Sequence, residues 1–263
     1  MFASILSAFS YVLLSYLLYS SVFKSRSYPK MAIYGSAGIG LLFHALSLYH
    51  LFFTPTGQNF ALFNVVALVS FICIVLLTVS HIKNDASALL FIVVPIGVIS
   101  LFSAQLVSSN QPIHSHILGW PLVHIITAVT AYSLFSLAAL QAVLMNVLDN
   151  RLRKNPSHIS PLLPPVQTMD NFLFQLISTG FILLTVALTS ASIYSIELIK
   201  SQPLHKLVLS IGSWLVFLAL LVGRHRFGWR GKTAVRWTLW GVSLLVLGYL
   251  GSKLALEFLI KNY

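Results

Sequence analysis

The sequence has few charged residues and almost no acidic ones. Only 8% of its 263 residues are charged, and 5 of them are Asp or Glu, whereas a soluble globular domain carries about 25% charged residues. So few charges cannot cover a core of ordinary size with a water-facing surface, which excludes a soluble protein. The one cysteine, Cys73, excludes an intramolecular disulfide and a cysteine-based zinc cluster.

Apolar residues dominate what remains. They make up 57% of the chain, which indicates an integral membrane protein with the lipid bilayer as its constant partner. The net charge of +11 would suit nucleic acid only if the basic residues formed one face of a soluble domain. They occur instead in short groups between apolar runs, so no nucleic-acid partner is expected.

Apolar runs of membrane-spanning length recur along the chain. A helix needs about 20 mostly apolar residues to cross roughly 30 Å of hydrocarbon. Eight segments meet this length, so we predict an all-α membrane protein, a polytopic bundle of eight transmembrane helices. The segments are 3–23, 32–53, 61–82, 88–108, 121–148, 172–196, 204–222 and 234–260.

The basic residues predict the orientation of these spans. Cytoplasmic loops are enriched in Lys and Arg, and with both termini outside the cell 12 of the 16 basic residues fall in cytoplasmic loops. The first apolar run is followed, not preceded, by basic residues, so it is expected to be a retained span and not a cleaved signal. The basic residues that fall at or near the outer side are Lys200, Lys206, Lys253 and Lys261.

A proline-containing stretch interrupts the series of spans. Residues 149–171 include Pro156, Pro161, Pro164 and Pro165 and are expected to form a cytoplasmic linker. The linker separates five spans in 1–148 from three in 172–263, within one transmembrane domain covering 1–263. The chain shows no internal repeat, which gives no support to the inverted-repeat architecture of many transporters.

Histidines are unusually frequent, with 9 in the chain. A histidine inside a membrane span has to face the bundle interior or a cavity and find a partner there. The predicted topology puts His124, His205 and His50 at the outer face and His44 near mid-membrane. Two imidazoles at one depth on different helices suit the axial positions of a haem iron. The alternative, equally open from composition, is that these histidines only form hydrogen bonds at the interface.

The start of the fifth span carries the most suggestive pattern. Trp120 suits the aromatic belt at the membrane surface, and Thr127, Ala128 and Ala131 follow His124 at helical spacing. A face of small residues admits either a neighbouring helix or a flat ligand. The opposite face is expected to meet lipid through Ile126, Val129 and Leu137.

Two lysines lie at the same predicted depth. Lys206 directly follows His205, and Lys253 lies near the outer end of the last span. Each could pair with a haem propionate carboxylate. The alternatives are that Lys206 extends its ammonium to the lipid headgroups and that Lys253 pairs with Glu257 one turn further on.

These residues together resemble the cytochrome c assembly family, including its CcsA/CcmC-like haem-handling members and a shorter HemX-like inner-membrane branch. The resemblance is clearest over 120–260. It rests on Trp120 to His124 with Ala131-Tyr132, on His205-Lys206 through Trp214, and on Arg224 to Gly231 with Tyr249-Leu-Gly251. The family's tryptophan-rich signature is absent before His205, and its ligand position in the seventh span falls near Val222.

The resemblance implies a non-covalently bound haem b near the outer leaflet. His124 corresponds to the family's outer axial ligand, and His205 takes the second position, with His44 or His50 as alternatives. Trp120, Lys206 and Lys253 complete the expected cofactor-binding set. Because the signature is missing, binding haem is expected and its transfer to apocytochrome is not.

Taken together, we expect a non-enzymatic, multi-pass protein of the bacterial inner membrane that binds, presents or senses haem during cytochrome c biogenesis. Cytochrome c assembly components are its expected protein partners. A HemX-like regulatory or scaffold protein, acting on a haem-biosynthesis enzyme through the basic loop 224–232, is the alternative. A transporter is a weaker third possibility, because buried acidic residues for ion coupling are scarce.

The predicted topology can be tested with reporter fusions. A fusion after Asn155 should behave as cytoplasmic and one after Asn110 as external, because Lys and Arg concentrate on the cytoplasmic side. The measurement is paired alkaline phosphatase and fluorescent-protein activity at each site. The reverse pattern at either site would contradict the orientation.

Overall fold

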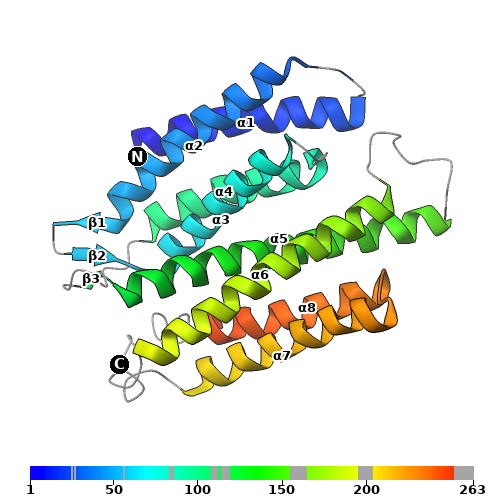
Figure 1. Cartoon of the computed structure of the whole chain (residues 1–263). Helices are drawn as coiled ribbons and strands as arrows, with labels where there is room; N and C mark the ends of the chain where they lie inside the picture. The colour runs from blue at the N-terminus through cyan, green and yellow to red at the C-terminus, as the bar shows by residue number, and fades with distance from the viewer. Residues whose placement is uncertain are drawn as a thin grey trace. The chain divides into compact units, whose positions relative to one another are not determined.

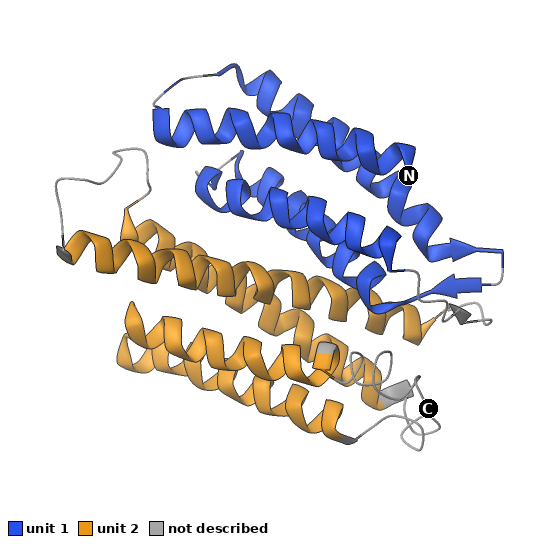
Figure 2. Ribbon diagram, turned by 180° about the vertical axis from the view of Figure 1, so that it is seen from behind, with its two compact units in different colours: residues 1–116, 157–164 blue, residues 117–156, 165–263 orange. Residues whose placement is uncertain are grey.

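The computed structural model describes residues 1–24, 26, 28–55, 57–82, 86–107, 112–113, 119–154, 165–194 and 204–251. Helices account for nearly all of this backbone (Figure 1). Contacts divide the described chain into two compact units (Figure 2): unit 1 holds the described residues up to Ile113, and unit 2 holds those from Gly119 onward.

Unit 1 contains four long helices and a small sheet. The helices are α1 (Phe2–Lys24), α2 (Lys30–Phe52), α3 (Leu62–Ser80) and α4 (Ser87–Leu106). Helix α1 packs on α2 and α4, and α3 packs on α2 and α4. The strands β1 (Phe53–Thr54), β2 (Gly57–Asn59) and β3 (Pro112–Ile113) pair antiparallel in the order β1-β2-β3, with Gln58 opposite both Phe53 and Ile113.

Buried hydroxyl groups join the helices of unit 1. The Ser4 and Ser47 hydroxyls lie 2.9 Å apart across α1 and α2, and the Ser7 hydroxyl donates to the Gly40 carbonyl at 2.9 Å. Polar groups in hydrocarbon need partners inside the protein, and small residues let the helices approach closely enough to supply them.

Unit 2 contains the other four helices: α5 (Trp120–Lys154), α6 (Val166–Tyr194), α7 (Leu204–Phe227) and α8 (Lys232–Val246). A π-helical turn, Leu247–Gly251, continues α8. Helix α5 packs on α6 and α8, and α7 packs on α6 and α8. The rings of Phe135 and Phe217 are stacked 4.0 Å apart in the core, where a Cβ on Gly241 would run into Phe217.

The described residues confirm a polytopic helical membrane protein. Seven of their helices are long and apolar enough to cross a membrane. The eighth predicted span, 234–260, is described as helix only as far as Gly251, and its remainder lies outside the described residues. The number of spans and the orientation of the termini therefore stay predictions.

The helices around the proline-containing stretch are longer than predicted. Helix α5 continues to Lys154 and α6 begins at Val166, so the connection between them is shorter than 149–171. The division into units falls between the fourth and fifth helices. The single domain over 1–263 with a cytoplasmic linker at 149–171 stays a prediction. Helix α5 groups with the later helices because α6 and α8 both pack on it.

One predicted lipid-facing residue is buried. Ile126 is 56% exposed, as expected, but Leu137 is fully buried, so its assignment to the lipid face was wrong. Because α5 contacts two neighbouring helices, more of its surface is covered than the single stripe of small residues indicated.

The close contact of α1 and α2 predicts a sharp difference between two glycines of α2. A Cβ on Gly40 would collide with the Tyr11 ring, whereas one on Gly38 meets nothing within 4 Å. Gly40→Ala should therefore lower the free energy of unfolding by about 1–3 kcal/mol through overpacking. Gly38→Ala, the matched control, should be neutral or stabilise by up to about 1 kcal/mol. Thermal or denaturant unfolding in detergent measures both, and equal effects would contradict the packing described here.

Candidate functional site

The two predicted axial histidines lie at the same end of unit 2. His124 is in the second turn of α5 and His205 is in the first turn of α7. Figure 1 shows that α5 and α7 begin at the end of the unit where α6 and the π-helical turn finish. No contact connects the two side chains, so their pairing remains a prediction.

A hydrogen bond fixes the ring of His124. Its Nδ1 lies 2.8 Å from the carbonyl oxygen of Ala187 on α6. A carbonyl oxygen can only accept, so Nδ1 carries the hydrogen and Nε2 keeps its lone pair. Histidines that bind metals commonly donate their other ring N–H to a carbonyl or carboxylate in this way. The imidazole is therefore held in the tautomer that can bind a metal through Nε2.

Small residues on these two helices are buried. Ala131 on α5 and Ala187 and Ser190 on α6 are each at most 2% exposed, and α5 packs on α6. The Thr127 hydroxyl donates to the Val123 carbonyl at 2.7 Å, so it is satisfied within its own helix. The small-residue face predicted for α5 therefore packs against a helix over at least part of its length.

The remaining predicted residues of unit 2 lie near the helix starts. Trp120 is 55% exposed at the first residue of α5. His205 is exposed and Lys206 is half-buried at the start of α7. Lys253 lies outside the described residues.

The two alternative ligands are in unit 1 and differ in environment. His44 is fully buried, and its Nδ1 lies 3.2 Å from the Tyr11 hydroxyl. The backbone of Ala67 is near the His44 ring, but no hydrogen bond of normal geometry reaches Nε2. His50 is exposed at the last turn of α2, beside the ring of Tyr49.

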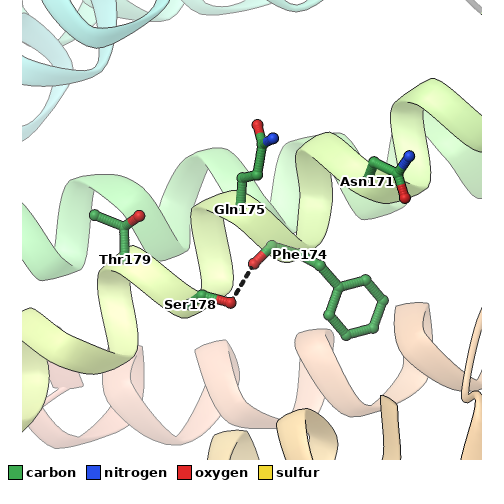
Figure 3. A pocket seen from close by; sticks show the side chains of 5 residues that line it. All are labelled: Asn171, Phe174, Gln175, Ser178 and Thr179. Atoms are coloured by element: carbon green, nitrogen blue, oxygen red, sulfur yellow. Dashed lines mark hydrogen bonds between the residues drawn. The ribbon is translucent and has the colours of Figure 1, made fainter. Parts of the chain in front are cut away.

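An open hollow on α6 was not predicted from the sequence. It has a volume of about 480 Å³ and is lined by Asn171, Phe174, Gln175, Ser178 and Thr179 (Figure 3). Its one internal hydrogen bond runs from the Ser178 hydroxyl to the Phe174 carbonyl at 2.7 Å. Eight residues, or about 12 Å of helix, separate Thr179 from Ala187, so this hollow is distinct from the surroundings of His124.

A buried ion pair at the opposite end of unit 2 was also missed. Arg224 Nη1 donates to Asp170 Oδ2 at 2.5 Å, and the two side chains are 19% and 8% exposed. Arg224 also donates to the Asn171 side-chain oxygen at 3.2 Å and lies over the Phe174 ring. The sequence placed Asp170 in the linker 149–171 and Arg224 in the basic loop 224–232. Asp170 lies near the start of α6 and Arg224 near the end of α7, so both are expected at the same membrane face. Only this shared position could have suggested a pair.

The fold and the buried polar contacts define a class, the polytopic helical proteins of membranes. Within it, the chain belongs to the cytochrome c assembly protein family, whose sequence profile matches residues 31–260. The chain is 30% identical to the inner membrane protein YpjD of Escherichia coli K12 over 238 residues, which is 90% of each chain. The homologue from strain O157:H7 matches to the same extent.

A more distant relative comes from Azospirillum brasilense. An uncharacterized 28.8 kDa protein in a nifR3-like 5′ region is 29% identical over 144 residues, 54% of this chain and 53% of that protein. No solved structure matches the chain.

Two ion pairs among the described residues of unit 2 predict different effects on stability. Removing one partner of a buried pair leaves an uncompensated charge and costs about 3–5 kcal/mol, so Asp170→Ala should strongly lower the unfolding temperature. The control is Asp149→Ala, which breaks an exposed i,i+4 pair with Arg153 worth about 0.5 kcal/mol or less. Equal decreases of the unfolding temperature in the two variants would show that the pair of Asp170 and Arg224 contributes no more to stability than the exposed pair, and would contradict this prediction.

Proposed function

We propose that this protein binds one haem b non-covalently at the end of unit 2 where α5 and α7 begin, with His124 Nε2 as an axial ligand. The observation that carries the proposal is the hydrogen bond from His124 Nδ1 to the Ala187 carbonyl. Membership of the cytochrome c assembly family supports it independently. When bound, haem supplies an iron centre whose two axial positions suit imidazole nitrogens.

His205 is the proposed second ligand. It begins α7 at the same end of unit 2 as His124, and its exposed imidazole is accessible to a bound group. Lys206 follows it with a half-buried side chain, and its ammonium is a suitable partner for a propionate carboxylate. Trp120 offers an exposed indole at the start of α5. We assign Lys253 to the second propionate.

The proposed role is to hold or present haem at the outer leaflet of the bacterial inner membrane for the cytochrome c assembly components. No group transfer by the protein's own residues is required. The 30% sequence identity to an inner membrane protein of Escherichia coli supports this location. His124 would hold the iron through Nε2, and its hydrogen bond to the Ala187 carbonyl would keep the ring in that orientation.

Single histidine variants test the proposal. His124→Ala should lower the haem content of freshly purified protein on the order of tenfold or more, since losing even an outer-shell partner of a metal site costs 10- to 100-fold in affinity. His205→Ala should keep haem but replace the low-spin spectrum with a five-coordinate one. The measurements are a pyridine haemochrome ratio and the Soret band.

His225→Ala is the matched control, because His225 is exposed near the far end of α7 and should leave both readouts unchanged. Circular dichroism verifies that each variant remains folded. If His44→Ala lost the spectrum while His124→Ala and His205→Ala kept it, the haem would belong to unit 1 and the assignment would be wrong.

A further inference from the structure

The connection between α7 and α8 carries a dense group of cations. We call residues 224–236 the basic turn. Arg224 points inward to Asp170, while the other cations are exposed to the surroundings. Lys232 and Arg236 are four residues apart on α8 and so share one helix face. The exposed cations are Arg226, Arg230, Lys232 and Arg236.

One carboxylate holds both ends of this turn. Asp170 accepts from Arg224, in the last turn of α7, through Oδ2. Its Oδ1 accepts from the backbone N–H of Gly231, directly before α8, at 3.5 Å. Arg224 also donates to the Trp229 carbonyl at 3.4 Å. The carboxylate of Asp170 is thus paired within the turn. The exposed cations project from a backbone that these hydrogen bonds hold in place.

Aromatic rings form a layer beside the cations. The indole of Trp229 lies against the backbone of Gly223, where any Cβ would collide with it. Trp229 is 5.3 Å from Trp237 and 6.3 Å from Phe227 between ring centroids, and Phe227 is 74% exposed. Gly228 and Gly231 allow the chain to fold back over this layer, because their φ angles are 65° and 57°.

The described acidic residues of unit 2 do not neutralise the exposed cations. Among its described residues the carboxylates are Asp149, which pairs with Arg153, and Asp170, which pairs with Arg224. Helix α7 is long and apolar enough to cross a membrane and ends at Phe227. A span of this extent brings the basic turn to the depth of the lipid headgroups. Exposed aromatic rings are typical of that depth.

We propose that the basic turn is a binding site for the phosphate groups of anionic phospholipids. The guanidinium and ammonium groups bind phosphate oxygens, and the exposed Phe227 ring enters the boundary between headgroups and acyl chains. An acidic soluble protein would match the charge but not the exposed ring at membrane depth. The site is separate from the proposed haem ligands, so either proposal can fail without the other.

A charge-matched pair of variants tests the site in the full-length protein. Arg226→Gln/Arg230→Gln/Lys232→Gln removes three cations from the basic turn. The control, Lys24→Gln/Arg26→Gln/Lys30→Gln, removes three exposed cations between α1 and α2. Native mass spectrometry in detergent then measures the retention of phosphatidylglycerol and of phosphatidylcholine by each protein.

The wild-type protein and the control should retain phosphatidylglycerol well and phosphatidylcholine poorly. The turn variant should bind phosphatidylglycerol on the order of a hundredfold more weakly than the control, because its three cations are held together on one backbone fixed by Asp170 and each contributes about fivefold. Equal losses in both variants, or no loss in the turn variant, would overturn the proposal. So would unchanged lipid retention with loss of a co-purifying acidic protein.

Discussion

Polar groups inside a bilayer have to find their hydrogen-bond partners within the protein, and the packing of this chain follows from that requirement. Hydrocarbon offers no competing water, so buried hydroxyls bond to their own helix, as Thr238 does to the Ala234 carbonyl, or join it to a neighbouring helix. Ser70 and Ser100 join α3 to α4 at 2.6 Å, and the Ser213 hydroxyl joins α7 to the Gly241 carbonyl of α8 at 2.8 Å. Glycines at the same interfaces provide the close approach that such short side chains need.

The same requirement has different consequences at the two ends of unit 2. At one end, Asp170 and Arg224 use their hydrogen-bonding capacity on each other and on adjacent groups, which produces a rigid connection. At the other end, His124 uses one ring nitrogen for a helix contact and keeps the other available. An ion pair whose two members also bond to adjacent groups is a structural element. A ring that is fixed but half satisfied is suited to binding a ligand.

The sequence predicted the helices better than their contacts. Length and hydropathy located the spans because both depend on local composition. The predicted end of the fifth span, at 148, lies before the end of α5, and the predicted start of the sixth, at 172, lies after the start of α6. Polar residues such as Arg151 and Gln167 continue those helices beyond the apolar run. The strands β1 to β3 are two or three residues long, which is too short to show an alternating apolar pattern in the sequence. The partner of His124 could not be predicted, because a backbone carbonyl such as that of Ala187 is present at every position of the chain.

The environments of the histidines distinguish the competing ligand assignments. His44 has no exposed surface, and its ring is enclosed by Tyr11 and Phe71, with centroid separations of 5.9 and 5.3 Å. A haem macrocycle is far wider than either separation, so ligation by His44 requires α1, α2 and α3 to move apart. His124 is only partly buried, at the beginning of a helix, and its orientation is already fixed by Ala187. Binding there keeps the helix contact intact, and His205 is exposed at the same end of unit 2. On this ground we keep His205, and not His44, as the proposed second ligand beside His124.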